Sequence, residues 1–267
     1  MKILIVGGGS MGQAFTRGII SSENEHSCFV IERETVNQNI CSESGAQVFG
    51  SISDLVNEVS VDDFDACVIA VKPNDVATVG EEFVGNIPDH SLVISIAAGV
   101  TIGSLQSYFV GFPVVRAMPN LAASQLLSAT AMCVADGLQE KDLFIANSIL
   151  EMLGTVVLVQ EDQMDLVTAI SGSGPAYFFF LAELLIQSAQ ERGMNAETAH
   201  QLVNQTFIGA ATMSNENGSI TALREKVTSP GGTTQAAITV FEENNLAELI
   251  GKALDTAVSR SIELSGK

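Results

Sequence analysis

The stretch ILIVGGGSMG at residues 3–12 decides the fold of this chain. Ile3–Val6 is a short apolar run that leads directly into glycines at positions 7, 9 and 12, and a helical segment follows. Between a strand and a helix, the spacing Gly-x-Gly-x-x-Gly predicts a tight turn, close approach of a pyrophosphate, and close packing of the helix on the strand. The N-terminus of that helix then faces the phosphates. We therefore expect a dinucleotide-binding unit at the start of the chain.

Short β-rich runs alternate with helical segments through the first part of the chain. The expected central strands are Ile3–Val6, Cys28–Ile31, Ala66–Val71, Leu92–Ser95 and Val114–Val115, and the runs Ala131–Val134 and Val156–Val159 bracket an expected helix at Glu140–Leu153. This alternation is typical of a parallel sheet covered by helices. From Asp162 onward the strand signal disappears, and the sequence reads as helices rich in Ala, Leu, Gln and Glu. We predict an N-terminal Rossmann-type doubly wound sheet, residues 1–161, and an all-helical C-terminal domain, residues 162–267.

Ligands of open α/β sheets bind at the carboxyl ends of the strands, so further cofactor contacts are expected where the other strands end. An acidic residue, Glu32, ends the second strand at about the 20-residue offset of the dinucleotide motif. The expected cofactor-binding residues are Val6, Gly7, Gly8, Gly9, Ser10, Met11, Gly12, Glu32, Arg33, Ala70, Val71, Lys72, Pro73, Ala97, Ala98 and Gly99. For Lys72 a solvated loop lysine is an equal alternative, and for Ala97–Gly99 the alternative is tight packing alone.

Glu32 and Arg33 give opposing indications about the adenosine ribose. Glu32 could accept hydrogen bonds from a free 2′-hydroxyl, which favours NADH, whereas Arg33 could pair with a 2′-phosphate, which favours NADPH. Both could also be ordinary charged residues at the end of a strand.

The composition excludes several classes of partner and compartment. The formal net charge of −19 argues against nucleic acid or an anionic membrane surface as the main partner. The 4 cysteines are scattered singly, without metal-type or redox pairing, which favours buried free thiols in a reducing cytoplasm. The first apolar run is too short for a signal peptide, and the aromatic stretch Tyr177–Ile186, interrupted by Glu183, is too short to span a membrane. We expect a cytoplasmic protein with no metal site.

The stretch Tyr177–Ile186 also predicts self-association. Phe178, Phe179, Phe180 and Leu181 would point all around a helix, and a helix that is apolar on every side is buried on every side. In a helical domain this small, such burial requires a second copy of the chain. The sequence therefore predicts an obligate homodimer built through the C-terminal half.

Three further segments contain Gly or Pro beside helical sequence: VRAMPN at 115–120, SGSGPAY at 171–177 and VTSPGGTT at 227–234. The last two also contain several small hydroxyl residues. Helix caps and turns use the same residues, so one such segment alone would mean little. Together with the glycine loop, AVKP at 70–73 and SIAAGV at 95–100, they make both domains of the chain resemble the pyrroline-5-carboxylate reductases. One departure is Leu121-Ala122-Ala123, which stands where the family often has Thr-Pro-Ala and therefore lacks a hydroxyl and a rigid proline.

The resemblance implies a Rossmann domain followed by an all-helical dimerisation domain, often with dimers arranged in a ring. The homodimer is the expected unit, and a decamer of five dimers is the larger form that such a ring would give. The resemblance also implies NAD(P)H-dependent reduction of a cyclic imine, 1-pyrroline-5-carboxylate, to L-proline. NADPH is then the expected cofactor, with NADH also accepted.

An imine substrate reduces what the protein must supply. Its nitrogen can enter already protonated and the carbon then accepts hydride without developing an anion, so orientation and charge complementarity supply most of what is needed. This suits a chain whose 3 histidines lie outside every motif. We expect backbone N–H groups of Gly231, Gly232 and Thr233 at a helix start to hold the substrate carboxylate. The Thr234 hydroxyl, the expected catalytic group, would hydrogen-bond the ring nitrogen, and Ser229 and Ser173 would line the pocket, with capping as their alternative role.

Two other functions compete with this reading. A β-hydroxyacid dehydrogenase-like enzyme also joins a Rossmann domain to a helical one, but it would use a catalytic lysine, and no lysine lies between Lys141 and Lys226. Lys226 could in principle serve. A non-catalytic dinucleotide-sensing regulator is the second alternative, although such a protein would not need both hydroxyl-rich turns.

Overall fold

The structure is a computed structural model that describes residues 1–215 and 219–264. The chain forms two compact units: residues 1–173 together with the segment from residue 257 onward, and residues 174–256. These units part between Ser173 and Gly174, within the segment that follows the predicted boundary at residues 161 and 162. That boundary stays a prediction.

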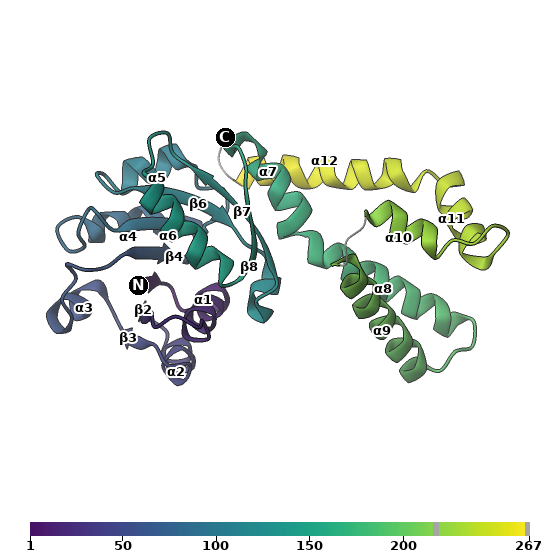
Figure 1. Cartoon of the computed structure of the whole chain (residues 1–267), viewed down its shortest axis with the longest axis horizontal. Coiled ribbons are helices and arrows are strands. Elements are labelled where there is room, and N and C mark those ends of the chain that lie inside the picture. Colours follow the sequence, from purple (N-terminus) through teal and green to yellow (C-terminus); the bar gives the residue numbers. More distant parts are fainter. Residues whose placement is uncertain (216–218, 265–267) are drawn as a thin grey trace. The chain divides into compact units, whose positions relative to one another are not determined.

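One sheet of eight strands organises the first unit, in the order β3-β2-β1-β4-β5-β6-β7-β8 (Figure 1). The strands are β1 Lys2–Val6, β2 Ser27–Ile31, β3 Gln47–Phe49, β4 Ala66–Ile69, β5 Leu92–Ser95, β6 Val114–Met118, β7 Ser128–Val134 and β8 Gly154–Leu158. All pairs are parallel except β6 with β7. The strand order reverses between β1 and β4, and ligands of doubly wound sheets bind beside such a reversal.

The predicted Rossmann-type sheet is confirmed, with small shifts in the strand ends. Strand β3 was not predicted, because it has only three residues and begins with the exposed Gln47. The expected helix at Glu140–Leu153 is present as α6, Glu140–Glu151.

Helices cover both faces of the sheet, so the central strands β1, β2, β4, β5 and β6 are buried on both sides, whereas Val157 and Leu158 of β8 are exposed. The first face carries α1 Ser10–Ile20, α2 Thr35–Glu43 and α6; the second carries α3 Ile52–Glu58, α4 Val76–Phe83, α5 Ile102–Tyr108 and α7 Met164–Val167. In β1 the side chains of Ile3 and Ile5 join the core under the first set, and those of Leu4 and Val6 join the core under the second. This alternation along a strand explains the continuous apolar runs in the sequence.

The described residues of the second unit are helical, which confirms the predicted all-helical C-terminal part. Its helices are α8 Gly174–Glu191, α9 Ala196–Ser214, α10 Ile220–Lys226, α11 Thr233–Glu243 and α12 Leu246–Leu264, whose last turns belong to the first unit. Phe178 and Phe179 of α8 contact Phe207 of α9, with ring centroids 6.1 and 6.3 Å apart. Among the described residues of this unit, Ala199 is the single buried apolar side chain.

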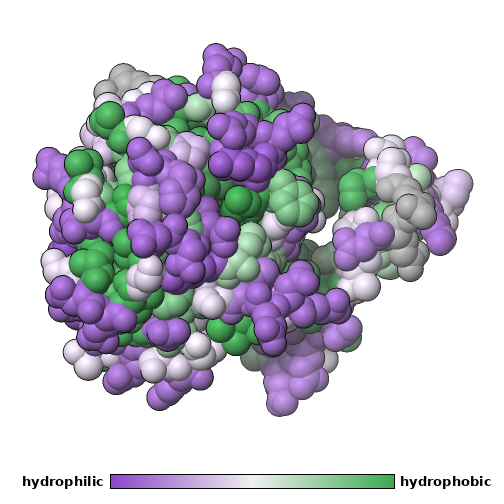
Figure 2. Space-filling model, turned by 60° about the vertical axis from the view of Figure 1, so that its left-hand side comes forward, coloured by the Kyte–Doolittle hydropathy of each residue, from purple (hydrophilic) through white to green (hydrophobic). Residues whose placement is uncertain are grey.

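The exposed apolar surface of α8 is large. Phe178 and Phe179 are each 58% exposed and Phe180 is 60% exposed. In the face turned to the viewer in Figure 2, hydrophobic residues are interspersed among hydrophilic ones, which is ordinary for a protein surface. A run of exposed phenylalanines on one helix is different, because contiguous apolar patches mark interaction sites.

The helical run Glu161–Glu191 is long and apolar enough to cross a membrane by length and composition. Tyr177–Ile186 alone is too short to span a membrane, but the longer run that contains it is not. A helix that is buried against a partner subunit can be equally long and apolar, so length and composition alone do not indicate a membrane span.

Candidate functional site

The glycine loop has the geometry that its spacing predicts. Gly7 has a φ of +104°, and a Cβ at this position would lie 2.7 Å from the carbonyl oxygen of Ala70. A Cβ at Gly12 would lie 1.9 Å from the carbonyl oxygen of Gly7. At Gly9, in contrast, a Cβ would meet nothing within 4 Å, although Gly9 lines the adjoining crevice. The packing of the chain itself thus explains two of the three glycines and leaves open space at the third.

No side chain caps the N-terminus of α1, whose N-cap is Gly9. The first N–H groups of a helix have no partner within the helix, and they favour anions. A loop that leaves room at Gly9 beside such donors fits the pyrophosphate of a dinucleotide.

A crevice of about 430 Å³ lies at the carboxyl ends of β1, β2 and β4. Eight expected cofactor residues line it: Val6, Gly7, Gly9, Glu32, Arg33, Ala70, Val71 and Lys72. The lining does not include Gly8, Ser10, Met11, Gly12, Pro73, Ala97, Ala98 or Gly99. A larger surface hollow of about 720 Å³ lies beside Met1 and His26, at the opposite ends of β1 and β2, where open α/β sheets do not bind their ligands.

The crevice also contains residues that the sequence analysis missed: Ile31, Glu34, Asn37, Ser51, Asp75, Thr78, Val79 and Glu82. Ser51 follows the unpredicted strand β3, so recognising that strand would have placed Ser51 at this edge. The others come from α2, η1 (Pro73–Asp75) and α4, or lie next to predicted positions.

The charged residues of the crevice differ in their surroundings. The Glu32 carboxylate accepts hydrogen bonds from the backbone N–H groups of Gly8, Arg33 and Glu34. Arg33 is 78% exposed, and its Nη2 lies 3.6 Å from Oε1 of Glu82. Lys72 is exposed, and among the described residues the structure gives it no ion pair.

The segments at 115–120 and 171–177 meet within the first unit. Asn120, which follows β6, donates from Nδ2 to the carbonyl oxygen of Ser171 at 3.1 Å. A Cβ at Gly172 would lie 3.1 Å from Cε of Met118. Ser171 and Gly172 belong to a π-helical turn, Thr168–Gly172, and the Ser173 N–H donates to Thr168 O at 2.9 Å. π-Helical turns are frequent at functional sites.

The departure Leu121-Ala122-Ala123 lies in a short 3₁₀ helix, η2 Leu121–Gln125, that Asn120 caps. Asn120 Oδ1 accepts from the Ala122 N–H at 3.1 Å. Leu121 is 61% exposed and Ala123 is fully buried. The turn therefore closes without the proline that the family often has there.

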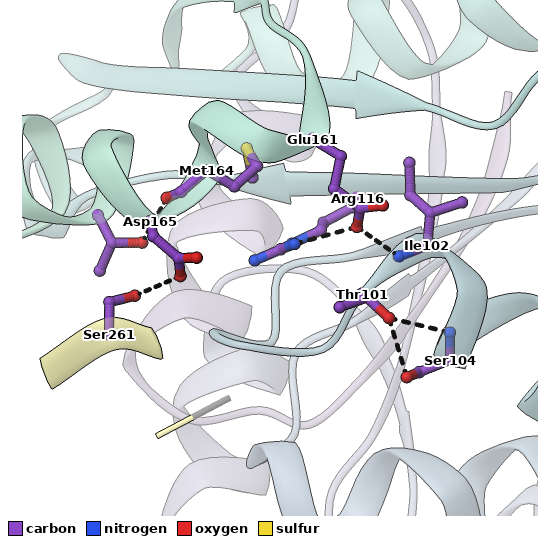
Figure 3. A network of polar contacts seen from close by, with 9 residues as sticks. Thr101, Ile102, Ser104, Arg116, Glu161, Met164, Asp165 and Ser261 are labelled. Carbon is purple, nitrogen blue, oxygen red and sulfur yellow. Dashed lines mark hydrogen bonds and ion pairs between the residues drawn. The ribbon is translucent and has the colours of Figure 1, made fainter. Parts of the chain in front are cut away.

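Figure 3 shows a network of polar contacts in the first unit that includes the buried Arg116 and Asp165. Arg116 of β6 donates from Nη1 to Oε1 of Glu161 at 3.1 Å, and the same oxygen accepts from the Ile102 N–H, at the start of α5, at 2.6 Å. Asp165 of α7 is buried and accepts from the Ser261 hydroxyl of α12 at 2.8 Å. Glu161 thus ties β6 to the start of α5, and the hydrogen bond between Asp165 and Ser261 separately ties α7 to the end of α12.

The turn before α11 lies in the second unit. Gly231 has a φ of +71°, and its N–H donates to Oε1 of Gln235 at 2.5 Å. The Gly232 N–H donates to Ser229 O at 3.0 Å. Two of the donors expected to hold a carboxylate are thus engaged inside the turn.

The first N–H groups of α11 remain available. Gly232 is the N-cap of this helix and no side chain caps it. Among the described residues the structure gives no acceptor for the N–H groups of Thr233 and Thr234. Thr234 is half-buried and Thr233 is exposed.

Comparison with known families gives two matches. A family model described as pyrroline-5-carboxylate reductase dimerisation matches residues 161–264. A model described as NADP oxidoreductase, coenzyme F420-dependent, matches residues 2–99. The second unit and its flanks thus resemble a dimerisation domain, and the first resembles a dinucleotide-dependent oxidoreductase.

Individual relatives resemble the chain along its whole length. Pyrroline-5-carboxylate reductase 1 of Bacillus subtilis is 33% identical over 99% of this chain and 89% of the relative. The solved structure of a pyrroline-5-carboxylate reductase from Coxiella burnetii is 36% identical, with a TM-score of 0.89 over 98% of this chain and 97% of that chain. The structure of Plasmodium falciparum pyrroline carboxylate reductase with NADP bound is 25% identical, with a TM-score of 0.80 over 99% of each chain.

Proposed function

Because this chain belongs to the pyrroline-5-carboxylate reductase family, we propose that it reduces 1-pyrroline-5-carboxylate to L-proline, the last step of proline biosynthesis. The chain is an NAD(P)-dependent oxidoreductase, and the bond reduced is the C=N bond of the cyclic imine. The observation that carries the proposal is the full-length likeness to these reductases, which includes the glycine loop and the Ser171–Tyr177 and Val227–Thr234 segments.

The cofactor is NAD(P)H, which supplies a hydride when bound. Gly7 and Gly9 allow the loop to approach the pyrophosphate, and the uncapped N–H groups at the start of α1 would hold it. The crevice beside Glu32 and Arg33 would hold the adenosine ribose. NADPH is the proposed preference, with NADH also used. The Arg33 side chain is 78% exposed, so its guanidinium could pair with a 2′-phosphate.

The substrate carboxylate is held, in this proposal, by the backbone N–H groups of Thr233 and Thr234. Gly231 and Gly232 shape the turn that presents these donors, since their own N–H groups are engaged within it. Backbone donors suit a chain with a net charge of −19, whose overall field does not attract anions. The site would thus recognise a carboxylate without a cationic side chain.

The Thr234 hydroxyl is the proposed catalytic group. A protonated imine nitrogen would donate its N–H to the hydroxyl oxygen, and this contact would orient the ring and hold the proton while the carbon accepts hydride. Ser229 and Ser173 are further proposed substrate-binding residues. Ser229 supports the turn directly, because its carbonyl oxygen accepts from the Gly232 N–H.

The assembly is proposed to be a homodimer, with a decamer of five dimers as the larger form. The dimerisation match covers residues 161–264, and this region carries the exposed phenylalanines of α8. A second copy of the chain would cover them, which also accounts for the apolar run Glu161–Glu191 without a membrane. We propose a cytoplasmic enzyme whose partners include neither nucleic acid nor membrane.

The test is a single absorbance assay of NADPH oxidation with and without pyrroline-5-carboxylate, in which we expect imine-dependent oxidation. A parallel screen of 3-hydroxy acids with NADP⁺ tests the β-hydroxyacid dehydrogenase alternative, and we expect no turnover there. Binding of NADPH without imine-dependent oxidation would support a dinucleotide-sensing regulator and overturn the proposal.

A further inference from the structure

The Glu32 side chain is turned toward the backbone rather than toward the crevice that it borders. Its Oε2 accepts from the Gly8 N–H at 2.7 Å. Its Oε1 accepts from the Arg33 N–H at 2.7 Å and from the Glu34 N–H at 2.8 Å. A carboxylate has about four acceptor positions on two oxygens, and here three of them are filled by main-chain donors.

Gly8 is matched to this contact. A Cβ at position 8 would lie 3.0 Å from Cβ and 3.1 Å from Oε2 of Glu32. The φ of Gly8 is not in the left-handed region, so its backbone conformation is open to other residues. The approach of Glu32 is what favours a glycine here.

The carbonyl of Gly8 is also fixed by a side chain. Gln13 of α1 donates from Nε2 to Gly8 O at 2.9 Å, and the same nitrogen lies 3.2 Å from Oδ1 of Asn37 in α2. Both backbone groups of Gly8 are therefore bound by side chains that join the glycine loop to β2 and α2. Gly9, the position with open space, follows immediately.

We propose that Glu32 is a positioning residue for the glycine loop and not a ligand of the adenosine ribose. It holds Gly8 so that Gly9 and the start of α1 are set to receive the pyrophosphate. This inference rests on the proposed function only in that a dinucleotide binds this crevice. Because the pyrophosphate is common to both cofactors, loss of the Glu32 carboxylate weakens NADPH and NADH alike.

A role as a ribose ligand makes the opposite prediction. Loss of the carboxylate would then weaken NADH, which has the 2′-hydroxyl, and would strengthen NADPH by removing a repulsive charge. The ratio of the two dissociation constants distinguishes the two roles.

The experiment compares Glu32→Gln with the matched control Glu43→Gln. Glu43, the last residue of α2, carries the same charge outside the crevice, and its exposed side chain has no hydrogen bond among the interactions described. The dissociation constants for NADPH and NADH are measured by calorimetry without imine, together with the melting temperature of the cofactor-free protein. We expect Glu32→Gln to raise both dissociation constants about 10-fold and to lower the melting temperature, and Glu43→Gln to change each dissociation constant by less than about 2-fold.

Turnover separates positioning from general damage to the fold. At saturating NADPH we expect the kcat of Glu32→Gln to stay within about 2-fold of the wild type, because bound cofactor restores the loop. A loss confined to NADH, tighter binding of NADPH, or unchanged binding of both would overturn the proposal. Since binding is measured without imine, failure of the proposed reduction would leave these results intact.

Gly8→Ala provides a second test that keeps every charge. The added Cβ displaces Glu32, so we expect both dissociation constants to rise, as in Glu32→Gln. The double variant should lose less than the sum of the two single losses, because both changes disturb one contact. A neutral Gly8→Ala, or strictly additive losses, would show that this contact does not position the loop.

Discussion

The Arg116 guanidinium is 3% exposed, and its described ionic partner, Glu161, is 35% exposed. One oxygen of Glu161 serves both Arg116 and the Ile102 N–H at the start of α5. Removing the acid leaves a buried positive charge without a partner, which costs more than the pair itself contributes.

Glu161→Ala should therefore reduce the free energy of unfolding by about 3 kcal/mol, the low end of the range for a broken buried pair. Urea unfolding at a fixed protein concentration measures this loss. Asp162→Ala removes an exposed neighbouring carboxylate and should change little. Adding Arg116→Met to Glu161→Ala should recover stability. Equal losses in Glu161→Ala and Asp162→Ala would show that Glu161 does not compensate the buried charge of Arg116.

Thr234→Ala should lower kcat/KM for pyrroline-5-carboxylate about 10- to 150-fold, the loss typical of a hydrogen bond to a charged group. Thr239→Ala, an exposed threonine of the same helix, is the matched control. The affinity for NADPH should not change in either variant. Turnover by Thr234→Ala within a factor of about two of wild type would show that the hydroxyl does not contact the ring nitrogen.

Arg33→Ala should weaken NADPH much more than NADH, by roughly 1.5–3 kcal/mol. Glu82, 3.6 Å from Arg33, competes for the guanidinium, so Glu82→Gln should strengthen NADPH slightly, as expected for an exposed pair. The neighbouring Glu81→Gln controls for charge alone. The measurement is kcat/KM for both cofactors. Equal losses in Arg33→Ala, or a wild type that strongly prefers NADH, would contradict the choice of NADPH.

Phe180→Glu should prevent assembly and leave little folded protein. Phe180 lies within the dimerisation match, and Ala199 is the single buried apolar side chain among the described residues of the second unit. Phe144 of α6 is 73% exposed and lies outside the match, so Phe144→Glu should assemble normally. Sedimentation shows the result. A folded, active monomer of the wild type or of Phe180→Glu would overturn the prediction of an obligate dimer.

The buried thiols predict a loss of stability at alkaline pH. Burial raises the pKa of Cys28 from its ordinary 9.0 to about 12, and it raises the pKa of Cys133 to about 11. Above pH 9 the unfolded chain releases thiol protons that the folded chain retains, so stability falls as the pH rises. Each thiol contributes up to about 1.4 kcal/mol per pH unit. Unfolding at several alkaline pH values should show a shallower slope for Cys28→Ala; parallel slopes would contradict this.

The sequence predicts the central strands well because they are buried on both faces and therefore read as continuous apolar runs. It misses β3, where Val48 and Phe49 are only half-buried and the apolar signal is too short. Ser51 was missed with it, because a residue can be placed at a strand end only when the strand is recognised.

The site was harder to predict in detail, since the direction of a polar side chain depends on neighbours that are distant in sequence. Glu32 has the offset of a ribose ligand, yet its carboxylate meets Gly8, which lies 24 positions earlier. The sequence likewise predicts that the Gly231 N–H is free to bind substrate, but in the structure the Gln235 side chain accepts it. Spacing identifies the residues that gather at a site, and local competition for hydrogen bonds decides which of their groups remain free.

Helices α1 and α11 both begin at a glycine without a side-chain cap. If their main-chain N–H groups bind the pyrophosphate and the carboxylate, an alanine scan across these helix starts would leave every such donor in place. Substitution by proline, which removes the N–H itself, is the change that would reveal them. Recognition of both anions would then persist through extensive change of the side chains around it.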